Sequence, residues 1–471
     1  GHIMVVIFIF LSMFLLPALL KIDHGLLLFG GNGLAPYSDM NGFGHFLQSF
    51  IWFKIYWLAF SFMMFLVAVV FSIRGTETRI TQRWKLSKIR WIPSLRKLSF
   101  VAIFIFGFSG CYIFYNTNVL NSYWTMSTQK THMANYEKTL KHFEHMPQPK
   151  IVAVNLKVDL FPSERNFTSE GYFILKNTHR EAIHNIHIQM VPHPQFYMEY
   201  IKMEGGAKLN NEHEKYAYKI FELNHPLQSG DSIKMEFKQI FTSKGFVEDP
   251  QFQILNNGTF IQQRQFPTIG YNEDIELEEE NDRADFGFQP KMRRAERDDP
   301  FAILDGRSDE DGEEINFEIV LGTDADQTAI APGYLQKEWT EDNRNYFHYK
   351  MDKPMSNFYS IVSARYEVKR DEWIPANNSL GEPVDLEIFY HKGHEYNLDK
   401  MMNGMKKSFD YFSQHFGAYQ YRQMRILEFP NYDVKAQSFP NTVPFSEGIG
   451  FVLDIDEEED VDMAFFVTTH E

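Results

Sequence analysis

The sequence predicts a multidomain protein in which transmembrane α-helices are followed by an antiparallel β-sandwich and then by the start of an α+β domain. Three observations predict this order. Long apolar runs occur only in the first 122 residues, short alternating runs begin near residue 150, and a strand followed by a helical stripe of Met and Phe begins at residue 384. Since a domain usually takes about 100–200 residues, a chain of 471 residues has room for these parts.

The composition excludes several classes of function. The formal net charge is −16, with 46 Lys and Arg against 62 Asp and Glu. A nucleic-acid-binding surface needs clustered Lys and Arg that locally outnumber the acids, so nucleic acid is not expected as a partner. The single cysteine, Cys111, excludes an internal disulfide framework and a Cys-based zinc site. Any metal must therefore be held by His and carboxylate side chains.

Three apolar runs without charge, residues 4–20, 55–73 and 98–116, predict transmembrane helices at about residues 4–20, 51–73 and 98–116, in a membrane region of residues 1–122. A helix needs about 20 apolar residues to cross the hydrocarbon layer, and the second and third runs reach that length. The first run is shorter and could instead be the core of a signal peptide. No small-residue cleavage site follows it, which favours a membrane helix.

The loop between the second and third runs, residues 74–97, is rich in Lys and Arg and contains Glu77 as its one acid. Short basic loops stay in the cytoplasm. We interpret this loop as a topology signal in contact with anionic lipid head groups rather than as a nucleic-acid site. Everything after residue 116 is then expected outside the cytoplasm.

Residues 123–149 are polar and predict a helical stalk, and residues 150–383 predict the β-sandwich. Apolar residues at every second position mark half-buried strands. Such runs occur at Ile151–Leu160, Gly171–Lys176, Ile183–Met190, Tyr216–Leu223, Ser232–Phe241, Ile315–Leu321, Tyr346–Met351 and Phe358–Val368. The strongly acidic stretch 273–314 has few core-forming residues and predicts a long solvated loop that is partly disordered, with a recognition element as the alternative.

Residues 384–471 show a different pattern. Val384–Tyr390 and Met424–Phe429 are predicted strands, and the Met and Phe stripe between them is predicted to be core packing of a helix. A further helix is expected in Val461–Glu471, after a run of acids of the kind that the helix dipole favours at a helix start.

Two pairs of histidines are not expected to bind metal. His184 and His187 lie on an alternating run that places them on opposite faces of a strand, and we expect both at the surface. His391 and His394 flank a glycine in a loop, and no carboxylates are expected near them.

The chain ends on His470-Glu471, carried by an apolar helix, and these are the first two residues of an HExxH zinc motif. In that motif two His at i and i+4 share one helix face and can bind one zinc. The Glu after the first His faces the metal-bound water and takes its proton. Two letters alone are weak evidence, but Glu447 lies upstream in an apolar segment.

Over about residues 150–471 the chain resembles the zinc aminopeptidases of the aminopeptidase N family (gluzincins). In that family a β-sandwich precedes a thermolysin-like α+β catalytic domain, and a Gly-Ala-Met-Glu-Asn strand precedes HExxH. The other matching pieces are Ile151–Leu160, residues 266–271, residues 415–417 and residues 419–421. With its amino-terminal membrane helices, the chain looks most like bacterial membrane proteins in which an ABC-transporter permease-type region is joined to such a peptidase domain.

This resemblance implies one zinc ion with His470 as its first ligand, Glu471 as the general base and Glu447 as the carboxylate that binds the substrate α-amine. Of the five-residue amine-binding motif only the Glu is kept, since residues 444–446 and Gly448 differ. The second His, the distal Glu ligand and the oxyanion-stabilising Tyr would lie beyond residue 471. This chain alone is therefore expected to be an inactive, incomplete form of the enzyme.

Three hypotheses follow. The first is a metallopeptidase, aminopeptidase-like, anchored as a multi-pass protein in the bacterial inner membrane and acting on peptides outside the cytoplasm. The second is an ABC-transporter permease-associated protein whose peptidase-like domain binds a substrate or partner without hydrolysis, together with an ATPase subunit. The third is a structural module on a membrane stalk. The expected partners are a peptide substrate and the lipid bilayer in the first case, with the ATPase added in the second.

Overall fold

The computed structural model describes residues 19–29, 33–72, 79–248, 254–291, 314–456 and 460–471, together with the single positions 7, 10, 11, 15, 75 and 298. The chain forms two compact units. The first comprises residues 1–35, 45–130 and 244–250, and the second comprises residues 36–44, 131–243 and 251–471.

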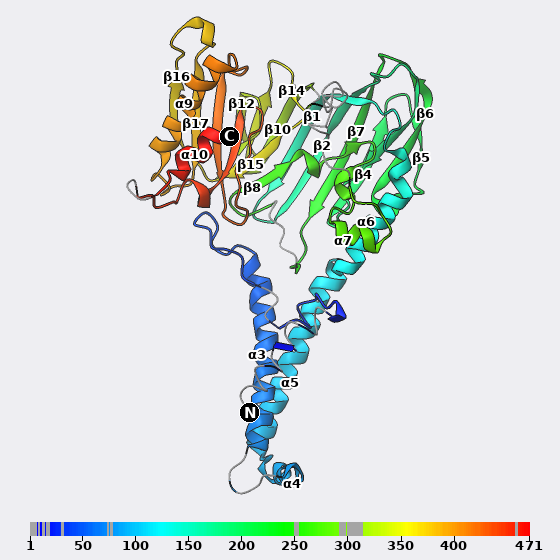
Figure 1. Ribbon diagram of the computed structural model, residues 1–471, viewed down its shortest axis with the longest axis vertical. Helices are drawn as coiled ribbons and strands as arrows, with labels where there is room; N and C mark the ends of the chain where they lie inside the picture. The colour runs from blue at the N-terminus through cyan, green and yellow to red at the C-terminus, as the bar shows by residue number, and fades with distance from the viewer. Residues whose placement is uncertain are drawn as a thin grey trace. The chain divides into compact units, whose positions relative to one another are not determined.

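The first unit contains two long apolar helices, α3 (Phe46–Phe71) and α5 (Pro93–Phe114), and α5 continues into the π-helical turn η2 (Tyr115–Leu120). The helices contact each other along their length (Figure 1). With mean hydropathies of 2.0 and 1.9, both are long and apolar enough to span a membrane. The predicted helix 4–20 lies mostly outside the described residues.

The predicted basic loop contains helix α4 (Ile80–Arg90). Two of its arginines bind carbonyl oxygens that the end of α3 leaves without helical partners. Arg83 Nε donates to Phe71 O at 2.9 Å, and Arg90 Nη1 donates to Ser72 O at 2.5 Å. Part of the basic charge therefore caps a helix.

The predicted stalk is helical. Helix α6 (Met126–Leu140) has a polar first part and a second part that packs on the β-structure of the second unit. Tyr136 and Leu140 are buried there against Tyr216 and Tyr218. Among its described residues this unit has the short 3-10 helices η3 (Lys141–Phe143), η4 (Glu214–Tyr216), η5 (Gln263–Gln265), η6 (Glu273–Ile275), η8 (Asn378–Leu380) and η9 (Glu447–Ile449).

An eight-stranded sheet is the largest part of the second unit. Its order is β12 (Tyr334–Glu341), β13 (Arg344–Lys350), β10 (Glu314–Asp324), β1 (Lys150–Phe161), β2 (Asn166–Lys176), β7 (Ser232–Thr242) and β4 (Phe196–Met203), and β14 (Met355–Ser356) pairs with β10. The edge strands β12 and β4 were not predicted, because β12 is largely exposed, β4 is mostly half-buried or exposed, and their sequences alternate weakly.

Two smaller sheets accompany it. One has the order β5 (Ala207–Asn210), β6 (Tyr218–Leu227), β3 (Ile183–Gln189) and β9 (Thr268–Ile269), and the other β11 (Thr328–Ile330), β15 (Ser360–Ala364) and β8 (Thr259–Gln262). Pairing is antiparallel throughout these sheets. The eight-stranded sheet departs from the predicted antiparallel arrangement at β1 and β10, which are parallel.

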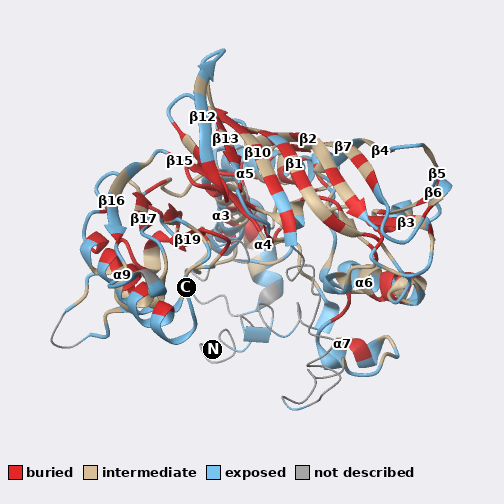
Figure 2. Ribbon diagram, turned by 90° about the horizontal axis from the view of Figure 1, so that it is seen from above, coloured by how far each residue is buried: buried red, intermediate tan, exposed pale blue. Residues whose placement is uncertain are grey.

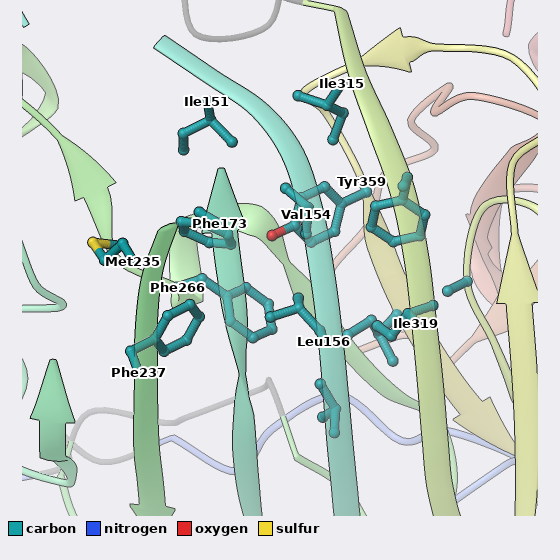
Figure 3. Packing of buried hydrophobic residues seen from close by; sticks show 14 of the residues in the cluster. Ile151, Val154, Leu156, Phe173, Met235, Phe237, Phe266, Ile315, Ile319 and Tyr359 are labelled. Atoms are coloured by element: carbon teal, nitrogen blue, oxygen red, sulfur yellow. The ribbon is translucent and has the colours of Figure 1, made fainter. Parts of the chain in front are cut away.

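The sandwich core follows from strand alternation. On β1, Val154, Leu156, Val158 and Leu160 are buried, and the residues between them are more exposed. Figure 2 shows the same change between buried and exposed positions along neighbouring strands. Side chains from β2, β7, β10 and the segment that contains Phe266 complete the cluster (Figure 3). Aromatic rings contribute much of this apolar area.

The expectation that His187 lies at the surface is wrong. His184 is exposed and His187 is buried, so the two do occupy opposite faces of β3, as predicted. The inner face of β3 is covered by Tyr218 and Phe143, and His187 Nδ1 lies 2.9 Å from the Tyr218 hydroxyl. Burial, with His213 and His142 nearby, lowers the pKa of His187 to about 4.

The first part of the acidic stretch 273–314 is not a solvated loop. It contains η6 and helix α7 (Glu280–Asp285), and Glu276 and Arg283 within it are buried. Arg283 forms a two-pronged ion pair with Glu137 of α6, at 2.9 and 3.0 Å. Most of residues 292–313 lie outside the described part of the chain.

A four-stranded sheet follows, with the order β16 (Glu367–Trp373), β17 (Val384–Tyr390), β18 (Gln423–Phe429) and β19 (Thr442–Ser446). Helix α9 (Leu398–His415) connects β17 to β18, and α10 (Met463–His470) packs on α9. The predicted core role of the Met stripe is confirmed, since Met401, Met402 and Met405 are buried against the sheet. Strand β16 precedes the predicted boundary at residue 384 but pairs with β17.

We expect the protein to lose stability between about pH 6.5 and pH 4 through His187. Its folded pKa lies below the ordinary value of 6.5, so in this range the unfolded chain binds the extra proton and is favoured. The loss should reach up to about 3 kcal/mol. Unfolding by urea at pH 7 and pH 4.5, followed by tryptophan fluorescence, should show a smaller pH effect for His187→Gln than for wild type. His184→Gln, on the exposed face of the same strand, should behave as wild type.

Candidate functional site

Three polar side chains meet at the carboxyl ends of neighbouring parallel strands. Strands β17 and β18 pair in parallel, as do β18 and β19. His394 lies in the loop after β17, Glu428 is the last residue but one of β18, and Glu447 directly follows β19. Carboxyl ends of adjacent parallel strands lie at one edge of a sheet, which is where ligands usually bind.

The three side chains are buried and close together. His394 is 4% exposed, Glu428 0% and Glu447 2%. One potential ligand atom from each lies within 4.8 Å of the other two. His394 Nδ1 and Glu428 Oε1 are 2.5 Å apart, a short hydrogen bond that links the β17 loop to β18.

Backbone N–H groups hold both carboxylates. The N–H of His391 donates to Glu428 Oε2 at 2.5 Å, and the N–H of Asn431 donates to Glu447 Oε1 at 2.9 Å. A third donor, the N–H of Met40, reaches Glu447 Oε2 at 3.3 Å. Each carboxylate is therefore fixed in orientation by main-chain atoms, which move less than side chains.

Met40 belongs to residues 36–44, a segment that directly precedes helix α3 yet lies in the second unit. Its carbonyl accepts a hydrogen bond from the Asn257 side chain at 2.8 Å, and the Gly42 carbonyl accepts one from the Tyr432 hydroxyl at 2.7 Å. Asp39 Oδ2 lies 3.5 Å from His394 Nε2. This segment therefore forms one wall of the site.

Burial shifts the protonation of the group. It raises the pKa of Glu428 to about 7, against the opposing effect of the His394 and His391 hydrogen bonds. It also raises the pKa of Glu447, which its hydrogen bonds oppose. Burial lowers the pKa of His394, but the hydrogen bond to Glu428 and the nearby carboxylates outweigh it and the net shift is upward. All three shifts mean that the cluster of His394, Glu428 and Glu447 binds a proton more readily than isolated side chains would, and another cation could take the place of that proton.

Asn397 fixes the turn that carries Glu447. Its side-chain N–H groups donate to the carbonyl oxygens of Gly450 at 2.7 Å and Leu453 at 2.9 Å, and the side chain is buried. Gly448 in the same turn approaches Asn431 closely, because an added Cβ would lie 2.3 Å from Asn431 Oδ1. These contacts tie the start of α9 to the segment after β19.

The residues of the predicted zinc motif lie on α10. The Asp462 side chain caps this helix by accepting a hydrogen bond from the N–H of Phe465 at 2.9 Å. The helix packs on α9 and on η9, the turn that begins at Glu447. His470 is exposed, and the carbonyl oxygen of Glu471 accepts a hydrogen bond from the Ser438 hydroxyl at 2.8 Å.

The described residues do not complete a zinc site on α10. A catalytic zinc needs three protein ligands, and His470 is not in the group of potential ligands that the described part of the chain brings together. That group consists of His394, Glu428 and Glu447. The metal and catalytic roles of His470 and Glu471 therefore stay predictions.

The expectation that no carboxylates lie near His391 and His394 is wrong. Glu428 and Glu447 are distant in sequence but enter the site from neighbouring strand ends. A sequence signal was present, since Glu428 and Glu447 each stand at the end of an apolar run of the kind that forms a buried strand. Predicting from this signal that Glu428 and Glu447 lie close together would have required knowing that β18 and β19 pair in parallel.

An apolar cavity of about 340 Å³ lies between α9 and the end of α10. Phe409, Phe412 and Phe416 line it from α9, and Thr468 and Glu471 line it from the end of the chain. Its lining does not include the His394 cluster, so these are two separate features of the second unit.

Comparison with family models and with curated proteins gives no match. Among solved structures the chain is similar to an M1 zinc metallopeptidase from Deinococcus radiodurans, with 11% identity, a TM-score of 0.43 and coverage of 64% of this chain and 61% of that one. It is also similar to a mutant two-domain M1 zinc metallopeptidase bound to L-arginine, with 12% identity, a TM-score of 0.45 and coverage of 69% and 64%.

A mutant of the Deinococcus radiodurans enzyme bound to a Tyr-Ser-Ala substrate gives 13% identity, a TM-score of 0.43 and coverage of 64% and 61%. The chain thus spans less than two thirds of the length of each of these structures. The likeness is partial, and the role of the site has to be argued from its own geometry.

We expect Asn397→Ala to destabilise the second unit by about 2–3 kcal/mol, because two buried carbonyl oxygens lose their donor. Asn403→Ala provides the matched control, since Asn403 is on the exposed face of α9 and its loss should change stability by less than about 0.5 kcal/mol. Urea unfolding measures both. Equal effects of the two substitutions would contradict the role assigned to Asn397.

Proposed function

We propose that this chain is the amino-terminal portion of a membrane-anchored zinc metallopeptidase of the aminopeptidase type, which acts on peptides outside the cytoplasm. One observation carries the proposal: the turn η9, which begins at Glu447, packs against α10, the helix that ends at His470. A buried carboxylate thus lies beside the helix that carries the first two residues of a zinc motif.

In this proposal Glu447 binds the free amino terminus of the peptide. A carboxylate pairs strongly with an ammonium group, and the N–H groups of Asn431 and Met40 hold this one in a fixed position. Fixing the amino terminus would place the first peptide bond, rather than an internal one, next to α10. Glu471 is proposed as the base that accepts a proton from the attacking water.

Because the described residues at α10 supply one imidazole, too few for a zinc site, we assign no step to zinc. The remaining ligands implied by the sequence resemblance would have to come from a longer polypeptide.

The change from Asn to Gly after the amine-binding Glu can be related to the structure around Gly448. Where the resembled family has Asn after the Glu, this chain has Gly448, and any side chain there would collide with Asn431. Asn431 itself donates its backbone N–H to Glu447. Asn431 is therefore proposed to take part in shaping the amine site, with a specificity that differs from the family pattern.

The chain order supports the proposed membrane topology. Residues 36–44 and residues 131–243 belong to the same unit, and the two apolar helices α3 and α5 lie between them in sequence. Two crossings return the chain to the side from which it started. With the basic loop 74–97 in the cytoplasm, the second unit would lie outside it.

The alternative is an ABC-transporter permease-associated protein whose second unit binds a substrate or partner without hydrolysis. His470 is exposed and does not belong to the buried group of potential ligands, which favours this alternative. This alternative does not require the Glu471 carboxylate, so the two proposals differ in a measurable way.

Glu471→Gln should lower peptide hydrolysis by the natural gene product at least about 100-fold, the usual contribution of a general base. Zinc content, measured by atomic emission, should stay that of the wild type, since the base is not a ligand. Glu372→Gln, an exposed substitution of the same kind, is the control. Unchanged turnover in Glu471→Gln would overturn the peptidase assignment and leave the binding role.

Glu447→Gln should raise KM for a peptide with a free amino terminus at least about tenfold, because a charge-assisted pair with the ammonium is lost. The same peptide with an acetylated amino terminus should be cleaved equally slowly by wild type and variant. Steady-state kinetics on the two peptides measures this difference. An equal rise in KM for both peptides would show that Glu447 does not bind the free amino terminus.

A further inference from the structure

Several buried polar atoms around the His394 cluster lack a hydrogen-bond partner. They are Ser38 Oγ, His391 Nδ1 and Asn431 Oδ1. The Ser38 hydroxyl lies beside Glu447, close enough to lower the pKa of the carboxyl, but not in good hydrogen-bond geometry. Buried polar atoms are normally paired, and several unpaired ones in one place indicate a ligand or water between them.

The same place has an imbalance of charge. Glu428 and Glu447 are buried carboxylates, and His394 is the side chain that faces them as a possible cation. In the described part of the chain, no Lys or Arg nitrogen lies within 4.0 Å of either carboxylate, although ion pairs of Lys and Arg are common elsewhere in the second unit. Buried carboxylates without a cation are costly, so an additional positive charge would be stabilising here.

We propose that His394, Glu428 and Glu447 form a binding site for a divalent transition-metal cation, separate from the zinc position that the sequence motif assigns to His470. One imidazole nitrogen and two carboxylates are a donor set that suits Mn²⁺, Fe²⁺ or Zn²⁺. All three side chains stand on strand ends or on short loops held by main-chain hydrogen bonds, so the donors are already gathered.

The distances fit a site that closes slightly around its ion. The potential ligand atoms lie within 4.8 Å of one another. Metal–ligand bonds of about 2.0–2.2 Å place ligand atoms about 3–3.5 Å apart, so side-chain movements of about 1 Å suffice. Three of the four carboxylate oxygens accept a backbone N–H and keep a further lone pair, and those N–H groups would orient the ligands from behind.

Asp39 extends the site. Its Oδ2 atom lies 3.5 Å from His394 Nε2, on the segment 36–44 that also donates the Met40 N–H to Glu447. Asp39 is 54% exposed and can turn toward a bound ion. A metal here would join three strand ends to a segment from the start of the chain.

One consequence rests on the proposed function. A metal ion and a substrate ammonium are both cations, so they would exclude each other at Glu447. The metal site itself does not require that the protein is a peptidase, and it can be tested without measuring hydrolysis.

The test is titration of the chelator-treated, detergent-solubilised protein with Mn²⁺, with free Mn²⁺ measured by electron paramagnetic resonance. Wild type should bind one more equivalent of Mn²⁺ than Glu428→Gln, or bind it at least about tenfold more tightly. His394→Ala should show the same loss. Glu372→Gln and His415→Ala remove an exposed carboxylate and an exposed imidazole and should bind Mn²⁺ as wild type does.

Glu428→Gln keeps the shape of the side chain, and thermal unfolding without metal shows whether each variant is folded. Mn²⁺ should raise the unfolding temperature of wild type and not that of Glu428→Gln. L-Leucinamide should weaken Mn²⁺ binding to wild type if Glu447 also binds an amine.

Equal Mn²⁺ binding by wild type, Glu428→Gln and His394→Ala would overturn the proposed site, as would the absence of binding to wild type. Mn²⁺ binding that L-leucinamide leaves unchanged would keep the metal site and contradict the amine-binding role of Glu447. Failure of the metal site and failure of the peptidase proposal are therefore separate results.

Discussion

The parallel pairing of β17, β18 and β19 is the constraint on which the candidate site depends. Parallel neighbours cannot be joined by a tight turn, so the chain needs a crossover, and α9 provides it between β17 and β18. Burial of the Met and Phe face of α9 against the sheet holds this crossover in place. The consequence is that His394, Glu428 and Glu447 leave their strands at one edge, where no antiparallel hairpin would have placed all three.

Gathering two carboxylates in a buried place has a cost, and the surrounding chain offsets it. Backbone N–H groups of His391, Asn431 and Met40 point at the carboxylate oxygens, and the His394 ring forms a hydrogen bond with Glu428. Main-chain dipoles stabilise an anion without a second side chain having to be ordered. That one of these donors comes from residues 36–44 shows that the segment directly before helix α3 is part of the site's architecture.

The β-structure that precedes this sheet gives it a rigid support. Arg425 of β18 is buried and donates to the carbonyl oxygens of Ala331 at 2.8 Å and Gly333 at 2.9 Å, and Phe429 stacks on Phe260 of β8 at 5.1 Å between ring centres. The contacts of Arg425 and Phe429 thus lie on the face of β18 opposite to helix α9. Glu428 lies between these contacts in sequence, which limits its freedom to move.

The features that depend on local pattern could be predicted from the sequence. Charge and apolar length indicated helices α3 and α5, alternation indicated β1 and the strands around it, and Val384–Tyr390 was found with its observed bounds. Each of these is readable because the residues that carry the signal are neighbours along the chain.

Which of these elements lie together became clear from the three-dimensional structure. Alternation could not show that β1 and β10 are parallel, that His187 is covered by Tyr218, or that the loop after β17 meets the end of β18. Strand pairing joins residues that are far apart in sequence, and burial of a polar group depends on what covers it. The His394 cluster is the product of both, so local sequence patterns are insufficient to predict it.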